Sequence, residues 1–219
     1  MKYIQTSDRF SADAVLLAHF VRPKGRACEL CAGGGIISLI LSARYPDLSI
    51  DAVEIDPAAA ETMAENFRIN SLDSHLHAVC GDLRLPILTA GGYGTVFCNP
   101  PYFNSGRLHS TRSHARSEVS CTLSEVCSAA GRLLCNGGRF FAVYRPERLA
   151  SIFCEMKNAG IEPKRLAFIK HRYGAAPSAV LIEGRKGGGE GLVVLPELIL
   201  FKKDGQPTAK YREIYGEFL

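Results

Sequence analysis

The segment RACELCAGGGIISLILSAR, residues 26–44, predicts a strand, a glycine turn and a helix in direct succession. Residues 26–30 are mostly apolar and typical of a buried strand, whereas the three consecutive glycines at 33–35 are typical of a tight turn. In 36–44 the apolar side chains can face a sheet from one side of a helix. A strand that passes directly into a helix is the basic unit of α/β folds, so we predict that class for the chain.

The same alternation continues along the chain. Further strands are expected at 49–54, 75–80, 94–98 and 138–144, and further helices at 57–70, 122–135 and 147–159. A helix with Ser11 as its N-cap, ending before Pro23, precedes the first strand. Strands that alternate with helices imply a mostly parallel sheet with helices on both faces.

The last third of the chain has a different pattern. Residues 161–170, 178–183 and 191–201 have the character of strands, without a convincing helix between the final two. We therefore expect an antiparallel hairpin at the C-terminal edge of the sheet, with the glycine-rich segment 184–189 as its turn.

Length and composition indicate one globular domain. The chain has 219 residues, of which 47% are hydrophobic and 22% are charged. We predict a single domain over 1–219, made of an N-terminal helical segment at 1–25, a core at 26–160 and C-terminal strands at 161–219. The chain shows neither a secretory signal nor an apolar run long enough to span a bilayer, so we expect a cytoplasmic protein that does not bind membranes. Its eight cysteines lie in apolar contexts, and we expect reduced thiols.

The two halves of the chain differ in charge. Residues 1–100 carry 8 Lys and Arg against 11 Asp and Glu, whereas 101–219 carry 18 against 11, which gives net charges of −3 and +7. Such asymmetry suggests a polyanionic partner near the second half, although an ordinary solvated basic surface has the same composition.

Three acidic residues at successive strand ends, Glu29, Glu54 and Asp82, suggest a nucleoside pocket. The glycine turn at 33–35 can bring the backbone close to a ligand, although in a dinucleotide fold its pattern would be G-x-G-x-x-G. Glu54, at the end of the next strand, can accept hydrogen bonds from ribose hydroxyls. Asp82 can accept from an adenine amino group, while Leu83 or Ile55 flanks the ring. Each acid alone is equally compatible with a simple turn residue.

The expected cofactor contacts extend over four strand ends. They are Glu29, Cys31, Ala32, Gly33, Gly35, Glu54, Ile55, Asp82, Leu83 and Asn99. Cys28 and Cys31 form a C-x-x-C pair, but no second pair completes a metal set, so we expect no metal site.

A proline-rich turn follows the strand at 94–98. The segment Asn99-Pro100-Pro101-Tyr102-Phe103 lies where ligands of open α/β folds bind, beyond the carboxyl end of a strand. Its prolines remove backbone donors, which leaves the Asn99 side-chain oxygen and the Pro100 carbonyl as two acceptors for the hydrogens of a planar amine. Tyr102 and Phe103 offer aromatic faces on which a planar base can stack. We therefore predict Asn99, Pro100 and Tyr102 as catalytic residues.

The polar loop at 104–118 contains several basic side chains and one acid. Arginines in such a loop can neutralise phosphates of an RNA whose base is turned out into the pocket, whereas an exposed loop that merely caps the next helix would look similar. The predicted substrate contacts are Tyr102, Phe103, Arg107, Arg112, His114, Arg116 and Arg145.

The order of these motifs resembles that of class I methyltransferases acting on amino groups. The segments FSADAVLL at 10–17, ARSE at 115–118, VYRPE at 143–147 and YREIY at 211–215 are most similar to the bacterial tRNA(Val) adenine-N6 methyltransferase family. This resemblance implies a Rossmann-like, seven-stranded sheet with a reversed last hairpin. It also implies S-adenosylmethionine as methyl donor, S-adenosylhomocysteine as product, and adenine N6 in tRNA as acceptor. Many members have Gly where this chain has Cys31.

Other functions share these motifs. A guanine-N2 rRNA methyltransferase and a protein-glutamine N-methyltransferase would use the same turn, although the latter usually has an additional N-terminal domain. An NAD-dependent oxidoreductase or a non-catalytic RNA-binding module would use the pocket differently. We expect a monomer or a weak homodimer.

Overall fold

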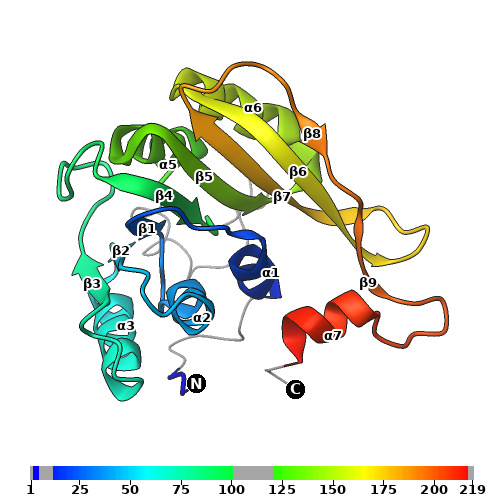
Figure 1. The fold of residues 1–219 in the computed structure, drawn as a ribbon, viewed down its shortest axis with the longest axis horizontal. Helices are drawn as coiled ribbons and strands as arrows, with labels where there is room; N and C mark the ends of the chain where they lie inside the picture. Colours follow the sequence, from blue (N-terminus) through cyan, green and yellow to red (C-terminus); the bar gives the residue numbers. More distant parts are fainter. Residues whose placement is uncertain (1, 5–11, 101–120, 217–219) are drawn as a thin grey trace, which may run out of the picture.

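A computed structural model describes residues 2–4, 12–100 and 121–216 (Figure 1). A central twisted sheet carries α1, α2 and α3 on one face and α5 and α6 on the other (Figure 1). The two hydrophobic clusters of the core lie on these two faces, with Phe67 and Phe141 in the first and Phe140 and Tyr93 in the second. The predicted α/β class is therefore confirmed.

The first half of the chain follows the predicted alternation closely. Its elements are α1 (Ala12–Phe20), β1 (Ala27–Leu30), α2 (Ile36–Arg44), β2 (Ile50–Glu54), α3 (Pro57–Ile69), β3 (Leu76–Cys80) and β4 (Tyr93–Cys98). Local chemistry sets the boundaries, as at α3, where the Asp56 carboxylate accepts a hydrogen bond from the Ala58 N–H and Pro57 occupies the first turn.

The second half contains more elements than expected. It comprises α5 (Leu123–Leu133), β5 (Leu134–Tyr144), the 3₁₀ turn η1 (Pro146–Arg148), α6 (Leu149–Asn158), β6 (Ile161–Arg172), β7 (Pro177–Lys186), β8 (Val193–Val194), β9 (Leu198–Phe201) and α7 (Ala209–Tyr215). None of the helices in the described ranges is long and apolar enough to cross a membrane.

Three details of the C-terminal prediction are wrong. The described residues form nine strands rather than seven, and α7 was not expected. The antiparallel hairpin joins β6 to β7, whereas segment 184–189 begins inside β7 and leads to β8 and β9, which pair with β6 in parallel. The expected strand at 191–201 is split because Leu195, Pro196 and Glu197 interrupt it between β8 and β9.

The strand order shows which edge of the sheet can hold a ligand site. The sheet runs β3-β2-β1-β4-β5-β7-β6-β8, with β9 also on β6, and β7 is the antiparallel member between β5 and β6. Leu30 at the end of β1 is level with Val53 in β2 and Cys98 at the end of β4. The chain segments after β1, β2, β3 and β4 therefore emerge together at one carboxyl edge, where open α/β sheets bind ligands.

Candidate cofactor pocket and catalytic turn

A cavity of about 270 Å³ lies at this carboxyl edge, where the segments after β1, β2, β3 and β4 meet. It is lined by Cys31, Gly33, Val53, Glu54, Ile55, Gly81, Asp82, Leu83, Arg84, Asn99 and Cys121. Seven of the ten predicted cofactor residues are in this set: Cys31, Gly33, Glu54, Ile55, Asp82, Leu83 and Asn99. The cavity is near the lower end of the size range typical of small-ligand sites.

The glycine turn is shaped by left-handed backbone at three positions. Gly33 has φ +54° and open space where a Cβ would lie, whereas Gly35 has φ +78° and would place a Cβ 2.8 Å from both Met63 and Phe67. Gly33 therefore leaves room for a ligand, and Gly35 allows α2 and α3 to pack. Cys31 has φ +56°, a conformation that disfavours side chains.

The Glu54 carboxylate accepts hydrogen bonds from the glycine turn after β1 and from the segment after β2. It accepts hydrogen bonds from the N–H of Gly33 at 2.8 Å, of Ile55 at 2.9 Å and of Asp56 at 3.0 Å. An ionised carboxylate has about four acceptor sites, so this geometry leaves capacity for a further donor such as a ribose hydroxyl.

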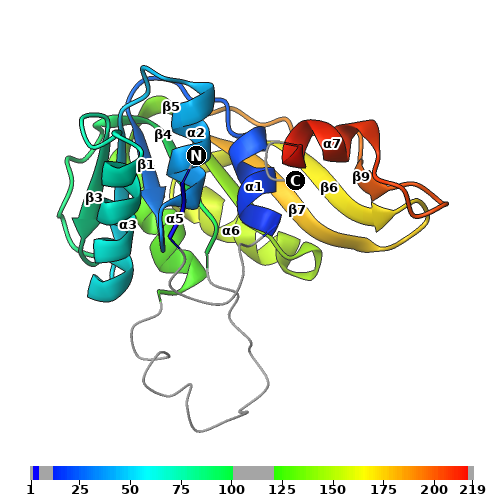
Figure 2. The same cartoon turned by 90° about the horizontal axis from the view of Figure 1, so that it is seen from below.

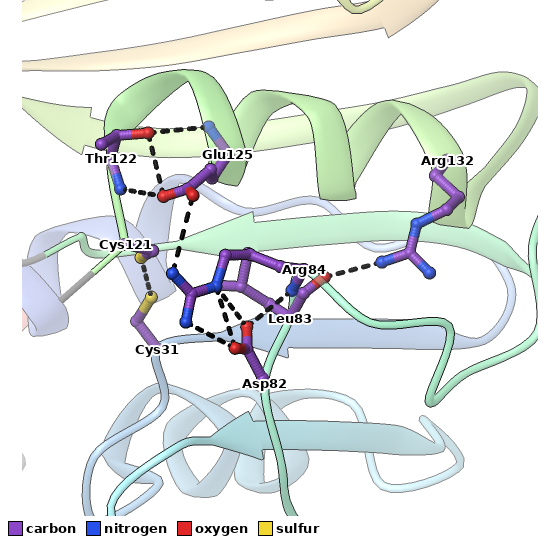
Figure 3. A network of polar contacts seen from close by, with 8 residues as sticks. All are labelled: Cys31, Asp82, Leu83, Arg84, Cys121, Thr122, Glu125 and Arg132. Carbon is purple, nitrogen blue, oxygen red and sulfur yellow. Dashed lines mark hydrogen bonds and ion pairs between the residues drawn. The ribbon is translucent and has the colours of Figure 1, made fainter. Parts of the chain in front are cut away.

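Asp82 forms an ion pair with Arg84 within its own loop (Figure 3). The guanidinium Nη2 lies 2.6 Å from Oδ2, and the hydrogen bonds from Arg84 lower the pKa of Asp82. Arg84 also approaches Glu125 of α5 at 3.7 Å. Asp82 is therefore ionised at neutral pH, and a ligand amine at this place would share it with Arg84.

Two side chains of helix α5 contact the same loop (Figure 3). Arg132 donates a hydrogen bond to the Leu83 carbonyl oxygen at 2.6 Å. At the other end of α5, Thr122 and Glu125 form a capping box, in which each side chain accepts from the other residue's backbone N–H. The loop after β3 is thus attached to both ends of α5.

Two thiols meet at the wall of the cavity. Cys31 Sγ and Cys121 Sγ lie 3.5 Å apart, and this contact together with burial raises the pKa of Cys121. All eight cysteines lie in the described ranges and are free thiols, and the described residues contain no cluster of three or more potential metal ligands.

Glu29 does not line the cavity, although the sequence pattern placed it in the cofactor set. It is buried behind the glycine turn, where its Oε2 accepts from the Ser38 N–H at 3.0 Å and contacts the Ser38 hydroxyl. Burial raises the pKa of Glu29 to about 8, and Glu54 adds to the rise, whereas the hydrogen bonds from Ser38 oppose it. Glu29 thereby connects β1 to α2. Ala32 and Gly35 likewise lie outside the cavity lining.

Asn99 brings an unpaired acceptor to the cavity. Its Oδ1 is buried and has no hydrogen-bond partner among the residues that the structure describes, and Pro100 beside it is buried. Because buried polar atoms in proteins are nearly always paired, this oxygen indicates a position for a donor from a ligand. The site therefore combines two carboxylates at strand ends with a free amide oxygen.

Most of the predicted substrate-binding residues lie outside the described ranges. Arg145 is exposed after β5 and does not line the cavity. Six others lie outside the described residues: Tyr102, Phe103, Arg107, Arg112, His114 and Arg116.

Four lining residues were not predicted: Val53, Gly81, Arg84 and Cys121. Val53 and Gly81 directly precede predicted residues, and Arg84 follows Asp82 by two positions, so strand-end position was a usable signal for all three. Cys121 reaches the cavity from the segment just before α5, which no local pattern indicates.

Known proteins share both sequence and fold with this chain. A family model described as "Methyltransferase small domain" matches residues 7–156. The tRNA1(Val) (adenine(37)-N6)-methyltransferase of Bacteroides fragilis strain ATCC 25285 is 29% identical over 180 residues, which cover 80% of this chain and 76% of that protein. The protein of the same name from Aliivibrio fischeri strain MJ11 is 30% identical over 178 residues, with coverage of 79% and 75%. The crystal structure of "a predicted O-methyltransferase" from Agrobacterium tumefaciens has a TM-score of 0.77 at 18% identity, covers 93% of this chain and 95% of that one, and shows a shared fold.

Proposed function

The chain belongs to the methyltransferase small domain family, and we propose that it transfers a methyl group from S-adenosylmethionine to N6 of an adenine in tRNA. The observation that carries the proposal is the buried Oδ1 of Asn99 at the edge of the cavity, which has no hydrogen-bond partner within the described part of the chain. An amine hydrogen of the substrate base would satisfy it.

The residues of the cavity fit the methyl donor. In this proposal Glu54 binds the ribose hydroxyls, Asp82 binds the adenine amino group of the donor, and the Gly33 turn leaves space for its amino-acid part. The sulfonium of S-adenosylmethionine supplies a methyl group that is already activated for displacement. The protein then has mainly to position the two reactants and exclude water.

Asn99 and the carbonyl of Pro100 bind the amine that receives the methyl group. Both are hydrogen-bond acceptors, so together they hold the two hydrogens of the amine and turn its nitrogen lone pair towards the methyl group. The methylated amine then releases one proton to solvent, and no strong base is needed beforehand because the neutral amine is the nucleophile. Tyr102 and Phe103 would stack on the base, and Arg107, Arg112, His114, Arg116 and Arg145 would contact the RNA.

The substrate assignment is supported by the relatives. Both curated proteins described above are named for N6 methylation of adenine 37 in tRNA1(Val), and they align over about four fifths of this chain. The net charge of +7 over residues 101–219 suits an RNA partner. A guanine-N2 methyltransferase would share the pocket, so the methylated base must be identified directly.

The test is product analysis after incubation with labelled S-adenosylmethionine and separate pools of tRNA, rRNA and protein. We expect labelled 6-methyladenosine in tRNA, identified by mass spectrometry of nucleosides. Label only in protein, or 2-methylguanosine in rRNA, would reject the proposal.

Two variants of Asn99 test its role in the methyl transfer. Asn99→Ala removes the acceptor and is expected to lower kcat by about 10²–10³-fold, the usual effect of losing one preorganised polar group. Asn99→Asp keeps an acceptor of the same shape and is expected to retain more activity than Asn99→Ala. Donor affinity, measured by calorimetry, should change far less than kcat in both variants.

A further inference from the structure

The end of β6 and the segment after β9 lie at the far end of the sheet from β3 (Figures 1 and 2). They carry an exposed basic surface. We call it the outer basic patch and define it as Arg172, Tyr173, Lys202 and Lys203, from the end of β6 and the segment after β9. All four residues are exposed, and the Tyr173 side chain is 67% exposed. Lys203 Nζ lies 5.6 Å from the centre of the Tyr173 ring, so the two segments are in contact.

The positive charges of the outer basic patch are largely uncompensated. Among the described residues, no carboxylate forms an ion pair with Arg172, Lys202 or Lys203. The neighbouring Lys170 differs in this respect, because it pairs with Glu197 at 2.7 Å. The one acid within the patch segment is Asp204, whose carboxylate accepts from the Gln206 N–H at 3.0 Å.

Aromatic packing holds this surface in place. The ring of His171, next to Arg172, lies 4.8 Å from that of Phe201, and Phe201 lies 4.8 Å from Tyr211 of α7. Tyr211 in turn stacks on Tyr215 at 4.5 Å. These contacts join β6, β9 and α7, so the patch is presented by packed elements at a fixed position.

The topology puts the outer basic patch on the same edge of the sheet as Asn99. Strands β4, β5, β6 and β9 run in one direction, so the ends of β6 and β9 point as the end of β4 does. The pairing registers place Leu166 of β6 level with Cys98, and Arg172 lies six residues beyond it. With three strand spacings of about 4.8 Å and about 3.4 Å per residue, the separation from the catalytic turn is on the order of 25 Å.

We propose that the outer basic patch binds the ribose-phosphate backbone of the RNA substrate at a point remote from the methylated base. This inference rests on the proposed function. Unpaired Arg and Lys side chains neutralise phosphates, and an exposed Tyr between them offers a stacking face for a nucleotide. A separation of about 25 Å exceeds the reach of a single nucleotide but suits a folded RNA that spans the edge of the sheet. A membrane surface is the less favoured partner, since Tyr173 is the one aromatic residue of the patch and no aliphatic, Phe or Trp side chain accompanies it for insertion into lipid.

The test compares two triple variants with equal loss of charge. The patch variant carries Arg172→Ala, Lys202→Ala and Lys203→Ala. The control variant carries Arg22→Ala, Lys24→Ala and Arg185→Ala, three exposed residues at the opposite, amino edge of the sheet. Direct binding of each protein to tRNA is measured between about 50 and 200 mM salt, so the result does not depend on turnover.

For the patch variant we expect tRNA affinity to fall about tenfold or more and the slope of log K against log salt to decrease by about 2–3. In the methylation assay KM for tRNA should rise, while kcat and S-adenosylmethionine affinity stay unchanged, because the patch is remote from the reacting atoms. The control variant should bind tRNA as the unmodified protein does.

Equal tRNA affinity for the patch variant and the unmodified protein would overturn the inference. The inference would also be overturned if the patch variant bound tRNA normally but no longer bound vesicles of anionic phospholipid that the unmodified protein binds. Failure of the proposed function is a different result, in which the unmodified protein makes no 6-methyladenosine in tRNA at all.

Discussion

At the scale of single residues, Cys31 has a backbone conformation that its side chain disfavours. Its φ of +56° lies in the left-handed region, which costs a residue with a Cβ about 1–2 kcal/mol relative to glycine. A glycine would relieve this cost but would lose about 0.4–1 kcal/mol through the greater entropy of its unfolded chain. Relief of strain is the larger effect, so at this position Gly should be better than Ala.

We therefore predict that Cys31→Gly is more stable than Cys31→Ala by about 0.5–1 kcal/mol, as both variants lose the same contact with Cys121. Urea unfolding of the two proteins provides the measurement. The opposite order, with Ala more stable, would mean that the left-handed conformation is not maintained in solution.

Glu29 makes the stability of the protein depend on pH. Burial raises its pKa to about 8, whereas an unfolded glutamate titrates near 4.3. Between these values the folded state keeps a proton that the unfolded state has lost, so this residue's contribution to stability falls as pH rises from about 4.3 to 8. Glu29→Gln has the shape of the protonated acid but does not titrate.

The expected result is that Glu29→Gln gains stability relative to the unmodified protein as pH increases from 5 to 8, with little further change above that. Chemical unfolding at several pH values would measure it, with Glu61→Gln on the exposed face of α3 as control. Parallel pH profiles for Glu29→Gln and the unmodified protein would contradict an elevated pKa.

Residue-level reasoning from sequence found most of the cavity but not its hydrogen-bonding pattern. Glu54 and Asp82 lie at the cavity as predicted, because strand-end position follows directly from the alternation of strands and helices. The sequence contains no sign that Asp82 is paired with Arg84, or that Glu29 faces Ser38 behind the turn. Those partners depend on the angle between strand and helix, which hydrophobic spacing does not specify.

At the scale of elements, the packing of α5 against α6 depends on a glycine. Gly131 is buried in α5, and a methyl group there would overlap the carbonyl oxygen of Ala159. Alanine would improve helix propensity by about 1 kcal/mol, but overpacking typically costs about 1–3 kcal/mol, and a backbone carbonyl cannot rotate aside. We predict that Gly131→Ala lowers the free energy of unfolding by about 1 kcal/mol or more.

Thermal or urea unfolding would measure this change. Gly189→Ala is the matched control, because no described heavy atom lies within 4 Å of the added methyl group, and it should be as stable as the unmodified protein or more stable by up to about 1 kcal/mol. Unchanged stability of Gly131→Ala would show that α5 and α6 can separate at low cost.

The elements themselves were predicted well as far as β7 and poorly after it. Strands such as β1 and β4 can be recognised in the sequence because they are short, mostly apolar runs, as is typical of strands buried on both faces. Strand β8 has two residues, both exposed, and β9 is only partly buried, so neither has a periodic pattern. Their pairing with β6 is a tertiary contact. Helix α7 has seven residues and is held by the contacts of Tyr211 and Phe201, which its sequence alone does not reveal.

At the scale of the whole molecule, the cavity joins the segments after β1, β2, β3 and β4, so a ligand there should stabilise the entire sheet. A ligand at 100 times its dissociation constant that binds only the folded state adds about 2.7 kcal/mol. For a protein of this size each kcal/mol raises Tm by about 2–4 °C, so saturating S-adenosylhomocysteine should raise it by about 5–10 °C.

NADH at the same concentration should leave Tm unchanged, since the turn lacks the pyrophosphate pattern of a dinucleotide fold. Glu54→Ala, measured by the same thermal scan, should lose most of the increase because its carboxylate holds the Gly33 turn. A larger shift with NADH than with S-adenosylhomocysteine would instead identify a dinucleotide-binding protein.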